Sequence, residues 1–146
     1  PKADKGSVKI SFFGTIDFGR IGEPRLTEDE VLLVASPLDI FATKLKVIIQ
    51  RPSTKDYVDI IRLIKNDESL IEALGAASVF FGTDFSPMLS LRALSYYGDL
   101  LPPLNPSDSS FLKRQVSEAL RSLSIKGLEK PALASENLSS KEVKNL

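Results

Sequence analysis

The chain has 146 residues, of which 42% are hydrophobic, so it is long enough for one buried core and too short to promise two full domains. Basic and acidic residues number 19 each, so no global field favours duplex DNA or an anionic membrane as partner. Cysteine and histidine are absent, which excludes disulfides, thiolate or histidine-ligated zinc sites and imidazole bases. The remaining catalytic groups are carboxylates, lysine, arginine and hydroxyls.

Targeting signals are also missing from the sequence. No apolar run approaches the roughly 20 residues of a membrane-spanning helix, and the first residues do not have the pattern of a signal peptide. We therefore expect a cytoplasmic protein that has neither a membrane nor DNA as its partner.

Two segments in the first third have the pattern of β-strands. Residues 8–13, VKISFF, alternate apolar and polar side chains, which is typical of a strand with one packed face. Residues 31–35, VLLVA, are apolar and mostly branched, and predict a buried strand leading into a helix. Between them, residues 15–22 predict either a short strand or an irregular loop. We expect 8–13 and 31–35 to pair in a small mixed sheet that leaves an apolar edge or face open to a second chain.

The first helix start is marked by Ser36, Pro37 and Asp39, which supply an N-cap, a proline at the first helical position and a capping-box acid. Apolar residues at helical spacing then form a core-facing stripe: Ile40, Phe41, Leu45 and Ile48. Lys44 lies inside this stripe, where a cation is out of pattern. Such a lysine either extends its ammonium group to water or serves a function.

A second helix start follows at Ser53 to Asp56, which again has the S-x-x-D form of a capping box. Its core stripe consists of Tyr57, Ile60, Ile61 and Ile64. Asp56 and Asp59 stand beside this stripe in the first turns, where carboxylates suit the positive end of the helix dipole. Because the spacing turns Lys44 toward the same seam, we expect an ammonium–carboxylate contact between the two helices.

The second half of the chain is predicted to be helical. Residues 68–82 predict a third helix closed by Gly82, and Ser86 with Pro87 begins a fourth that reaches Tyr97. Residues 109–124 have apolar residues at helical spacing and predict a fifth helix.

The expected fold class is therefore α/β (α+β), with a small mixed sheet followed by a bundle of about five helices. This domain is expected to cover residues 1–125, and residues 126–146 are predicted to be a flexible C-terminal tail. The aromatic residues of the bundle are expected to be core residues and not base-stacking surfaces, because no basic run is interleaved with them: Phe80, Phe81, Tyr96 and Tyr97.

One long segment resembles a family signature. LDIFATKLKVIIQRPSTKDYVDI, residues 38–60, looks like the motif DLxAxKLxALxQRxxxKDxxDI of the AbiEii/AbiGii-type nucleotidyltransferase toxins. The segments VKISFF, FGRIGEP and LLVAS before it, and SLRALSYYGDL after it, are similar to the flanks in that family. The resemblance covers roughly residues 7–123.

The resemblance also implies a segment that this sequence does not contain. Members of the family carry, upstream of such a strand, a Gly-Gly or Gly-Ser helix start and a strand with an Asp-x-Asp pair that holds metal ions and a nucleoside triphosphate. The chain is thus expected to correspond to the C-terminal two thirds of the domain and to be inactive alone. Asp17 is the candidate metal ligand that remains, although a lone acid between apolar residues is more often an exposed turn residue.

By resemblance, Lys44 is the phosphate ligand, Asp56 and Asp59 complete this half of the catalytic site, and Arg51 and Lys55 are auxiliary cations for the nucleotide. Nucleotidyl transfer needs such groups because charge gathers on the phosphorus oxygens and on the leaving pyrophosphate. Mg²⁺, a nucleoside triphosphate, an RNA or other acceptor, and a cognate antitoxin or a second copy are the implied cofactors and partners. The alternative is a non-catalytic protein- or RNA-binding module derived from the same fold.

Overall fold

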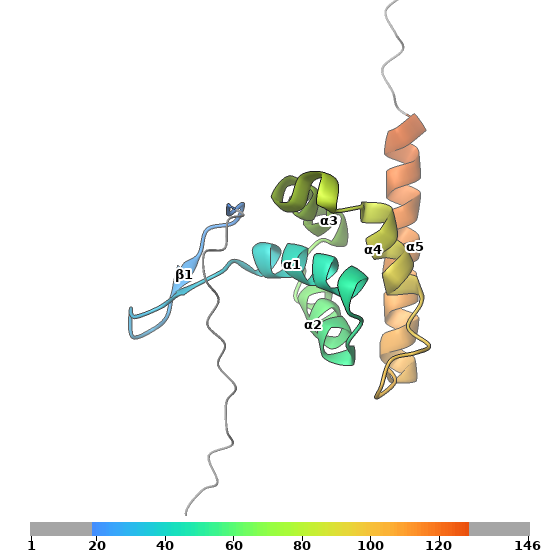
Figure 1. Ribbon diagram of the computed structural model, residues 1–146, viewed down its shortest axis with the longest axis horizontal. Coiled ribbons are helices and arrows are strands. Elements are labelled where there is room, and N and C mark those ends of the chain that lie inside the picture. Colours follow the sequence, from blue (N-terminus) through green and yellow to red (C-terminus); the bar gives the residue numbers. More distant parts are fainter. Residues whose placement is uncertain (1–18, 129–146) are drawn as a thin grey trace, which may run out of the picture.

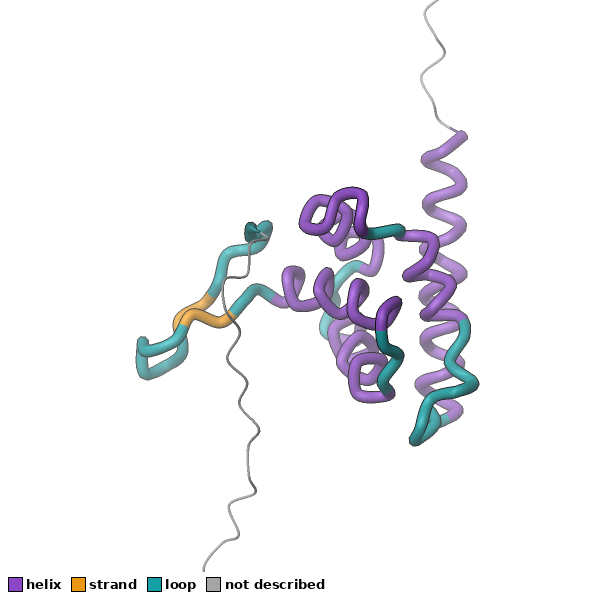
Figure 2. Tube along the Cα trace, in the orientation of Figure 1, coloured by secondary structure: helices purple, strands orange, loops and turns teal. Residues whose placement is uncertain are grey.

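The computed structural model describes residues 19–128, and within this range the chain forms five α-helices, a short 3-10 helix and one β-hairpin (Figure 1). The tube in Figure 2 shows the helices gathered together, with the hairpin to one side of them. This arrangement confirms the predicted mixed helix and sheet class. The predicted strand at 8–13 and the candidate metal ligand Asp17 lie outside the described residues.

The sheet consists of β1 (Arg25–Leu26) and β2 (Leu33–Val34), which pair antiparallel. Residues 31–35 were expected to form a buried strand, and this prediction is wrong. Val31 and Leu33 are 71% and 68% exposed, because β1 pairs along the edge of β2 and does not cover its faces. The expected exposed apolar sheet face is present, and such a face usually marks a contact surface.

Helix α1 (Pro37–Gln50) occupies the middle of the bundle and contacts α2, α3 and α4. It begins as predicted, since the Ser36 hydroxyl accepts a hydrogen bond of 3.0 Å from the backbone N–H of Asp39. The apolar stripe of α1 is buried in the core, with Phe41 and Leu45 both at 0% exposure. Ser90 of α4 donates its hydroxyl to the carbonyl of Leu45 at 3.2 Å and so ties α4 to α1.

Helix α2 (Thr54–Lys65) begins at the predicted place but without the predicted capping box. Ser53 is the N-cap residue, yet its side chain makes no capping hydrogen bond. The Asp56 side chain binds Lys44 across the interface with α1. Of the two roles that the sequence left open for Asp56, the contact with Lys44 is therefore present and the capping bond from Ser53 is not.

Helices α3 (Leu70–Phe81) and α4 (Pro87–Ser95) follow the predicted order, joined by the 3-10 helix η1 (Gly82–Asp84). Gly82 has φ of 51°, the left-handed conformation that closes α3 as expected. Helix α4 ends at Ser95, before the expected Tyr97.

Helix α5 (Pro106–Leu128) is longer than predicted at both ends. Its start has a capping residue that the sequence reading missed, because the Asn105 side chain accepts a 2.8 Å hydrogen bond from the backbone N–H of Asp108. The helix continues into the first residues of the predicted tail, and residues 129–146 lie outside the described range. Among the described residues, no helix has both the length and the apolar character that crossing a membrane requires.

All five helices contribute to one core, whose largest fully buried side chains are those of Tyr57, Phe41, Leu45, Ile48, Ile60, Ile61, Leu91, Leu94 and Leu112. Phe80, Phe81 and Tyr97 are partly buried against it, as expected. Tyr96 was predicted to be a core residue and is 67% exposed, because the helix has ended before it.

Candidate functional site

The charged residues singled out in α1 and α2 meet in one cluster. The Lys44 Nζ lies 2.8 Å from Oδ1 of Asp56 and 2.8 Å from Oδ2 of Asp59. The predicted ammonium–carboxylate contact is therefore present, with both aspartates on the same lysine.

The position of the cluster follows from helix geometry. Lys44 lies in the apolar stripe of α1 between Ile40 and Ile48, so its stem is carried toward the interface with α2. Asp56 and Asp59 are spaced by three residues in the first turns of α2, which places them on one face of that helix. The stem is thereby packed along apolar surface while the ammonium group reaches the edge of the interface.

The three side chains differ in exposure. Asp56 is 11% exposed, Lys44 25% and Asp59 40%, so the cluster runs from the interior to solvent. A further cation, Arg62, lies on the exposed side, with a nitrogen 3.9 Å from Oδ1 of Asp59. Asp59 thus has a second cationic neighbour and the freest access to water.

The ammonium group of Lys44 is strongly held in its charged form. Burial by itself disfavours the ammonium and would lower the pKa of Lys44, but the hydrogen bonds and charges of Asp56 and Asp59 outweigh this effect and raise the pKa. Lys44 is consequently a permanent cation at neutral pH and is unsuited to act as a general base.

Two cavities open on the cluster, and Lys44 lines both. The larger, of about 450 Å³, is bounded by the segment before β1, by the hairpin and by α1, and includes the side chains of Arg20, Thr43 and Phe80. The smaller, of about 210 Å³, is shared by Lys44, Asp59 and Arg62. The Lys44 side chain therefore borders two openings and, at 25% exposure, is not sealed in the core.

Asp39 has a role that the sequence reading did not identify. Its buried carboxylate accepts hydrogen bonds from the backbone N–H groups of Ile21 at 3.2 Å and of Gly22 at 3.1 Å. These bonds fix one wall of the larger cavity to the start of α1. From the sequence, Asp39 was predicted to be a capping-box acid and no further role was expected. A glycine at position 22 is consistent with a close approach to another segment, but it does not identify that segment.

That approach is tight enough to require glycine at position 22. A Cβ placed there would lie 2.1 Å from the Oγ and 2.4 Å from the Cβ of Ser36. The segment before β1 therefore lies directly against the N-cap of α1.

The remaining predicted site residues are not brought into the cluster. Arg51 is the C-cap residue of α1 and Lys55 lies in the first turn of α2, and both side chains are exposed. Within residues 19–128, neither side chain makes an ion pair or a hydrogen bond. Asp17 lies outside the described residues.

A resident metal ion does not fit the acidic groups that the structure describes. Over residues 19–128, no three histidine, cysteine, aspartate or glutamate side chains lie close enough together to hold one. The carboxylates of Asp56 and Asp59 are instead engaged with Lys44. Each cavity is lined by two cations and one carboxylate: Arg20, Lys44 and Asp39 in the larger, and Lys44, Arg62 and Asp59 in the smaller.

Comparison with protein families gives one match. The model of the family described as "Nucleotidyl transferase AbiEii toxin, Type IV TA system" matches residues 2–136. No curated protein and no solved structure matched the chain. The family description names a toxin–antitoxin system, which implies an antitoxin as partner, and a nucleotidyl transferase, a class that generally uses nucleoside triphosphates and metal ions.

Proposed function

Because the chain belongs to the AbiEii nucleotidyl transferase toxin family, we propose that Lys44 binds the polyphosphate of a nucleoside triphosphate from which a nucleotidyl group is transferred to an RNA acceptor. The observation that carries this proposal is the position of Lys44, whose side chain is 25% exposed, lines two cavities and is held by two carboxylates. Acidic partners would serve a structural lysine equally well, so it is the two cavities beside Lys44 that support a ligand role.

Binding of a polyphosphate requires Lys44 to give up part of its present pairing. Asp59 is the partner to be released, because it is 40% exposed and has Arg62 beside it to take over its charge. Asp56 is 11% exposed and would be left uncompensated if it lost its lysine, so it stays in place and orients the ammonium. The lysine would then neutralise charge on the polyphosphate while the phosphorus–oxygen bond breaks.

Once released, Asp59 is available to the acceptor. In the transfer, the acceptor hydroxyl oxygen forms a bond to the α-phosphorus, the bond to pyrophosphate breaks, and the hydroxyl proton passes to a carboxylate oxygen of Asp59. The smaller cavity, lined by Asp59 and Arg62, is the side from which that hydroxyl approaches.

Mg²⁺, when bound, would supply charge neutralisation at the transferring phosphate. By resemblance to the family, its main ligands are an Asp-x-Asp pair that residues 1–146 do not contain, and Asp17 is kept as a further candidate, so residues 1–146 alone are expected to be inactive in transfer. Arg51 and Lys55 are proposed as auxiliary cations for the nucleotide, since both are exposed and free of ion pairs within residues 19–128.

The proposal is tested first by binding. Calorimetric titration of this chain with a nucleoside triphosphate is compared for wild type, Lys44→Met and Lys113→Met, the last being an exposed lysine of α5 that serves as the matched control. We expect Lys44→Met to weaken binding at least tenfold and Lys113→Met to leave it unchanged. Equal affinity of wild type and Lys44→Met would overturn the assignment of Lys44.

Transfer is tested in a chain extended upstream by an Asp-x-Asp segment of the family, with a labelled nucleoside triphosphate, magnesium and an RNA acceptor. Asp59→Asn is expected to reduce the rate of transfer while retaining nucleotide binding, because the proton acceptor alone is lost. Full transfer activity in Asp59→Asn would remove this residue from the mechanism.

A non-catalytic binding module is the second candidate, and the exposed apolar hairpin favours it. Val31, Leu32 and Leu33 are 71%, 62% and 68% exposed, and exposed apolar side chains of this size are common where proteins make contact. This reading predicts that the extended chain shows no transfer to any acceptor while protein or RNA binding persists in Lys44→Met.

A further inference from the structure

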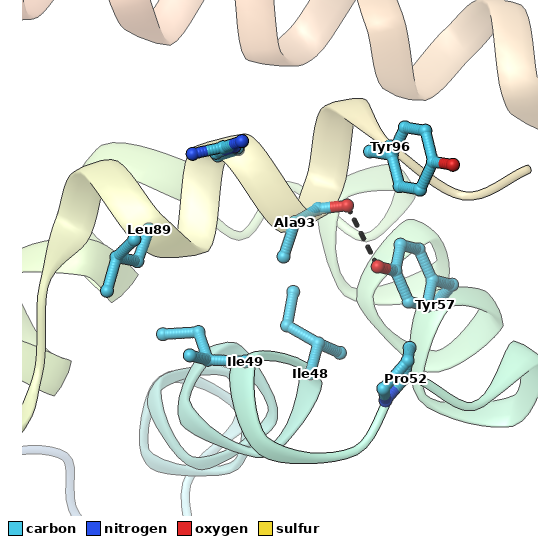
Figure 3. Close-up of a pocket in the computed structure, with 8 residues that line it drawn as sticks. Ile48, Ile49, Pro52, Tyr57, Leu89, Ala93 and Tyr96 are labelled. Carbon is cyan, nitrogen blue, oxygen red and sulfur yellow. Dashed lines mark hydrogen bonds between the residues drawn. The ribbon is translucent and has the colours of Figure 1, made fainter. Parts of the chain in front are cut away.

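A groove lies between α1 and α4, apart from the Lys44 cavities, with which it shares no lining residue (Figure 3). Its volume is about 470 Å³. Figure 3 shows the side chains of Ile48 and Ile49 on one side, Leu89 and Ala93 on the other, and Tyr57 close to Tyr96 at one end. The walls are thus almost entirely apolar.

The floor of this groove is buried and is joined by a hydrogen bond between two helices. The Tyr57 hydroxyl donates a 2.8 Å hydrogen bond to the backbone carbonyl of Ala93, which joins α2 to α4 beneath the opening. Tyr57 is only 1% exposed, and Ile48 only 2%. A site formed in advance in this way spares an occupant the cost of ordering it.

The rim, by contrast, presents apolar side chains to water. Leu89 is 51% exposed and Tyr96 is 67% exposed, and Met88 next to the groove is 61% exposed. Leu89, Ala93 and Tyr96 recur at helical spacing and so form a stripe along one side of α4 and its C-terminal end.

The charge among the side chains that line the groove is positive. Arg92 lines it, and no aspartate or glutamate does. Within residues 19–128, the Arg92 side chain makes no ion pair. A second exposed cation, Arg51, directly precedes the lining residue Pro52.

We propose that this groove binds an amphipathic helix of a partner protein, with the apolar face of that helix in the groove and a carboxylate of the helix paired with Arg92. Two aliphatic walls and an exposed stripe at helical spacing match the way in which helices dock in grooves. The unpaired cation selects an acidic flank, and the absence of lining carboxylates removes any repulsion.

A single-stranded RNA is the weaker fit for this surface. RNA-binding grooves follow the phosphate backbone with repeated cations and offer faces for base stacking. Here Arg92 is the one charged residue among the lining residues, and the other walls are aliphatic apart from Tyr57 and Tyr96.

The test uses fluorescently labelled 18-residue peptides of designed sequence and measures anisotropy against the full chain. One peptide combines a leucine stripe with glutamate flanks, a second has lysine in place of glutamate, and a third keeps the glutamates without the leucines. A single-stranded RNA is the fourth probe. The proteins are wild type, Arg92→Glu, Leu89→Asp and, as the matched control on α5, Arg121→Glu.

Wild type is expected to bind the leucine–glutamate peptide at least tenfold more tightly than the other probes. Arg92→Glu should reverse the preference to the lysine peptide, and Leu89→Asp should lose binding of both, while Arg121→Glu should match wild type. Because Leu89 is 51% exposed and Arg92 is exposed, these variants should fold, which circular dichroism checks.

Four outcomes would overturn the proposal. Equal binding of the leucine-free acidic peptide would indicate general charge attraction, and tighter binding of RNA that is lost in Leu89→Asp would assign the groove to nucleic acid. A wild-type dimer that is lost in Leu89→Asp, by light scattering, would assign it to a second copy of this chain. No peptide preference at all would equally refute it.

Discussion

Lys44 of α1 and Asp56 of α2 are joined by a contact of 2.8 Å across the interface between the two helices, with Asp56 only 11% exposed. The same lysine reaches Asp59 at 2.8 Å, but that carboxylate is 40% exposed. The two pairs share one cation and one distance, and they differ in solvation. Solvation should therefore decide how much each pair contributes to stability.

A double-mutant cycle measures this difference. Combining Lys44→Met with Asp56→Asn should give a coupling energy of about 1–2 kcal/mol, above that of a surface pair because Asp56 is only 11% exposed. The corresponding cycle with Asp59→Asn should give about 0–1 kcal/mol, as for a surface pair. Urea unfolding supplies the energies, and a larger coupling for Asp59 than for Asp56 would contradict the ranking.

The contact of Lys44 with Asp56 and Asp59 was predictable from the sequence, because helix spacing is a local property. Capping residues fixed the start of α1, the stripe fixed the direction of Lys44, and the next helix start fixed the aspartates. What spacing could not reveal was the competition between partners, since Asp56 exchanges its capping role for the lysine. Whether Asp56 caps α2 or binds Lys44 depends on how α1 and α2 approach each other in the folded chain.

The hairpin illustrates a different failure. The branched apolar residues at 31–35 would gain free energy from burial. The sequence of this segment does not show which other element, if any, packs against it. In the described residues β2 pairs only with the short β1, so burial does not follow from composition. The Asp39 contacts were missed for a related reason, because they join residues 17 and 18 positions apart through a loop without periodicity.

The contact of Gly22 with Ser36 gives a prediction with a matched control. Gly22→Ala should destabilise the fold by about 1–3 kcal/mol, since a Cβ would lie 2.1 Å from the Ser36 Oγ and the Asp39 hydrogen bonds would be displaced. Gly19→Ala should change little, because nothing lies within 4 Å of its Cβ position. Thermal unfolding of both variants checks this, and equal melting temperatures would argue against the close approach.

At Gly75, substitution by alanine should raise the stability of the protein. It lies in the interior of α3 and is exposed, and a Cβ there would meet nothing within 4 Å. Gly75→Ala should therefore stabilise the protein by about 0.5–1 kcal/mol, because alanine loses less backbone entropy than glycine in a helix. Gly82→Ala is the contrasting variant, since Gly82 has φ of 51° and alanine should be strained there. Urea unfolding should rank Gly75→Ala above wild type and Gly82→Ala below it, and the reverse order would refute both assignments.

Two groups predict a loss of stability at alkaline pH. Burial raises the pKa of Tyr57 above its ordinary value of 10.0. The pKa of Lys44 is raised above 10.5, because the bonds to Asp56 and Asp59 outweigh the opposing effect of burial. In both cases the folded chain holds its proton more tightly than the unfolded chain. The contribution of these two groups to stability should thus be constant below pH 10.0 and fall as the pH rises through the folded-state values.

Tyrosine absorbance at 295 nm isolates the contribution of Tyr57 within that window. The chain has 3 tyrosines, and Tyr57, at 1% exposure, should ionise last in the folded protein. Tyr57→Phe should remove the latest step of the titration, cost about 1 kcal/mol at neutral pH through loss of the hydrogen bond to Ala93, and make the alkaline fall in stability shallower. The fall that remains should shrink further in Lys44→Met. An unchanged titration in Tyr57→Phe, or a stability that stays level from pH 9 to pH 11.5 in wild type, would show that neither group is shifted as described.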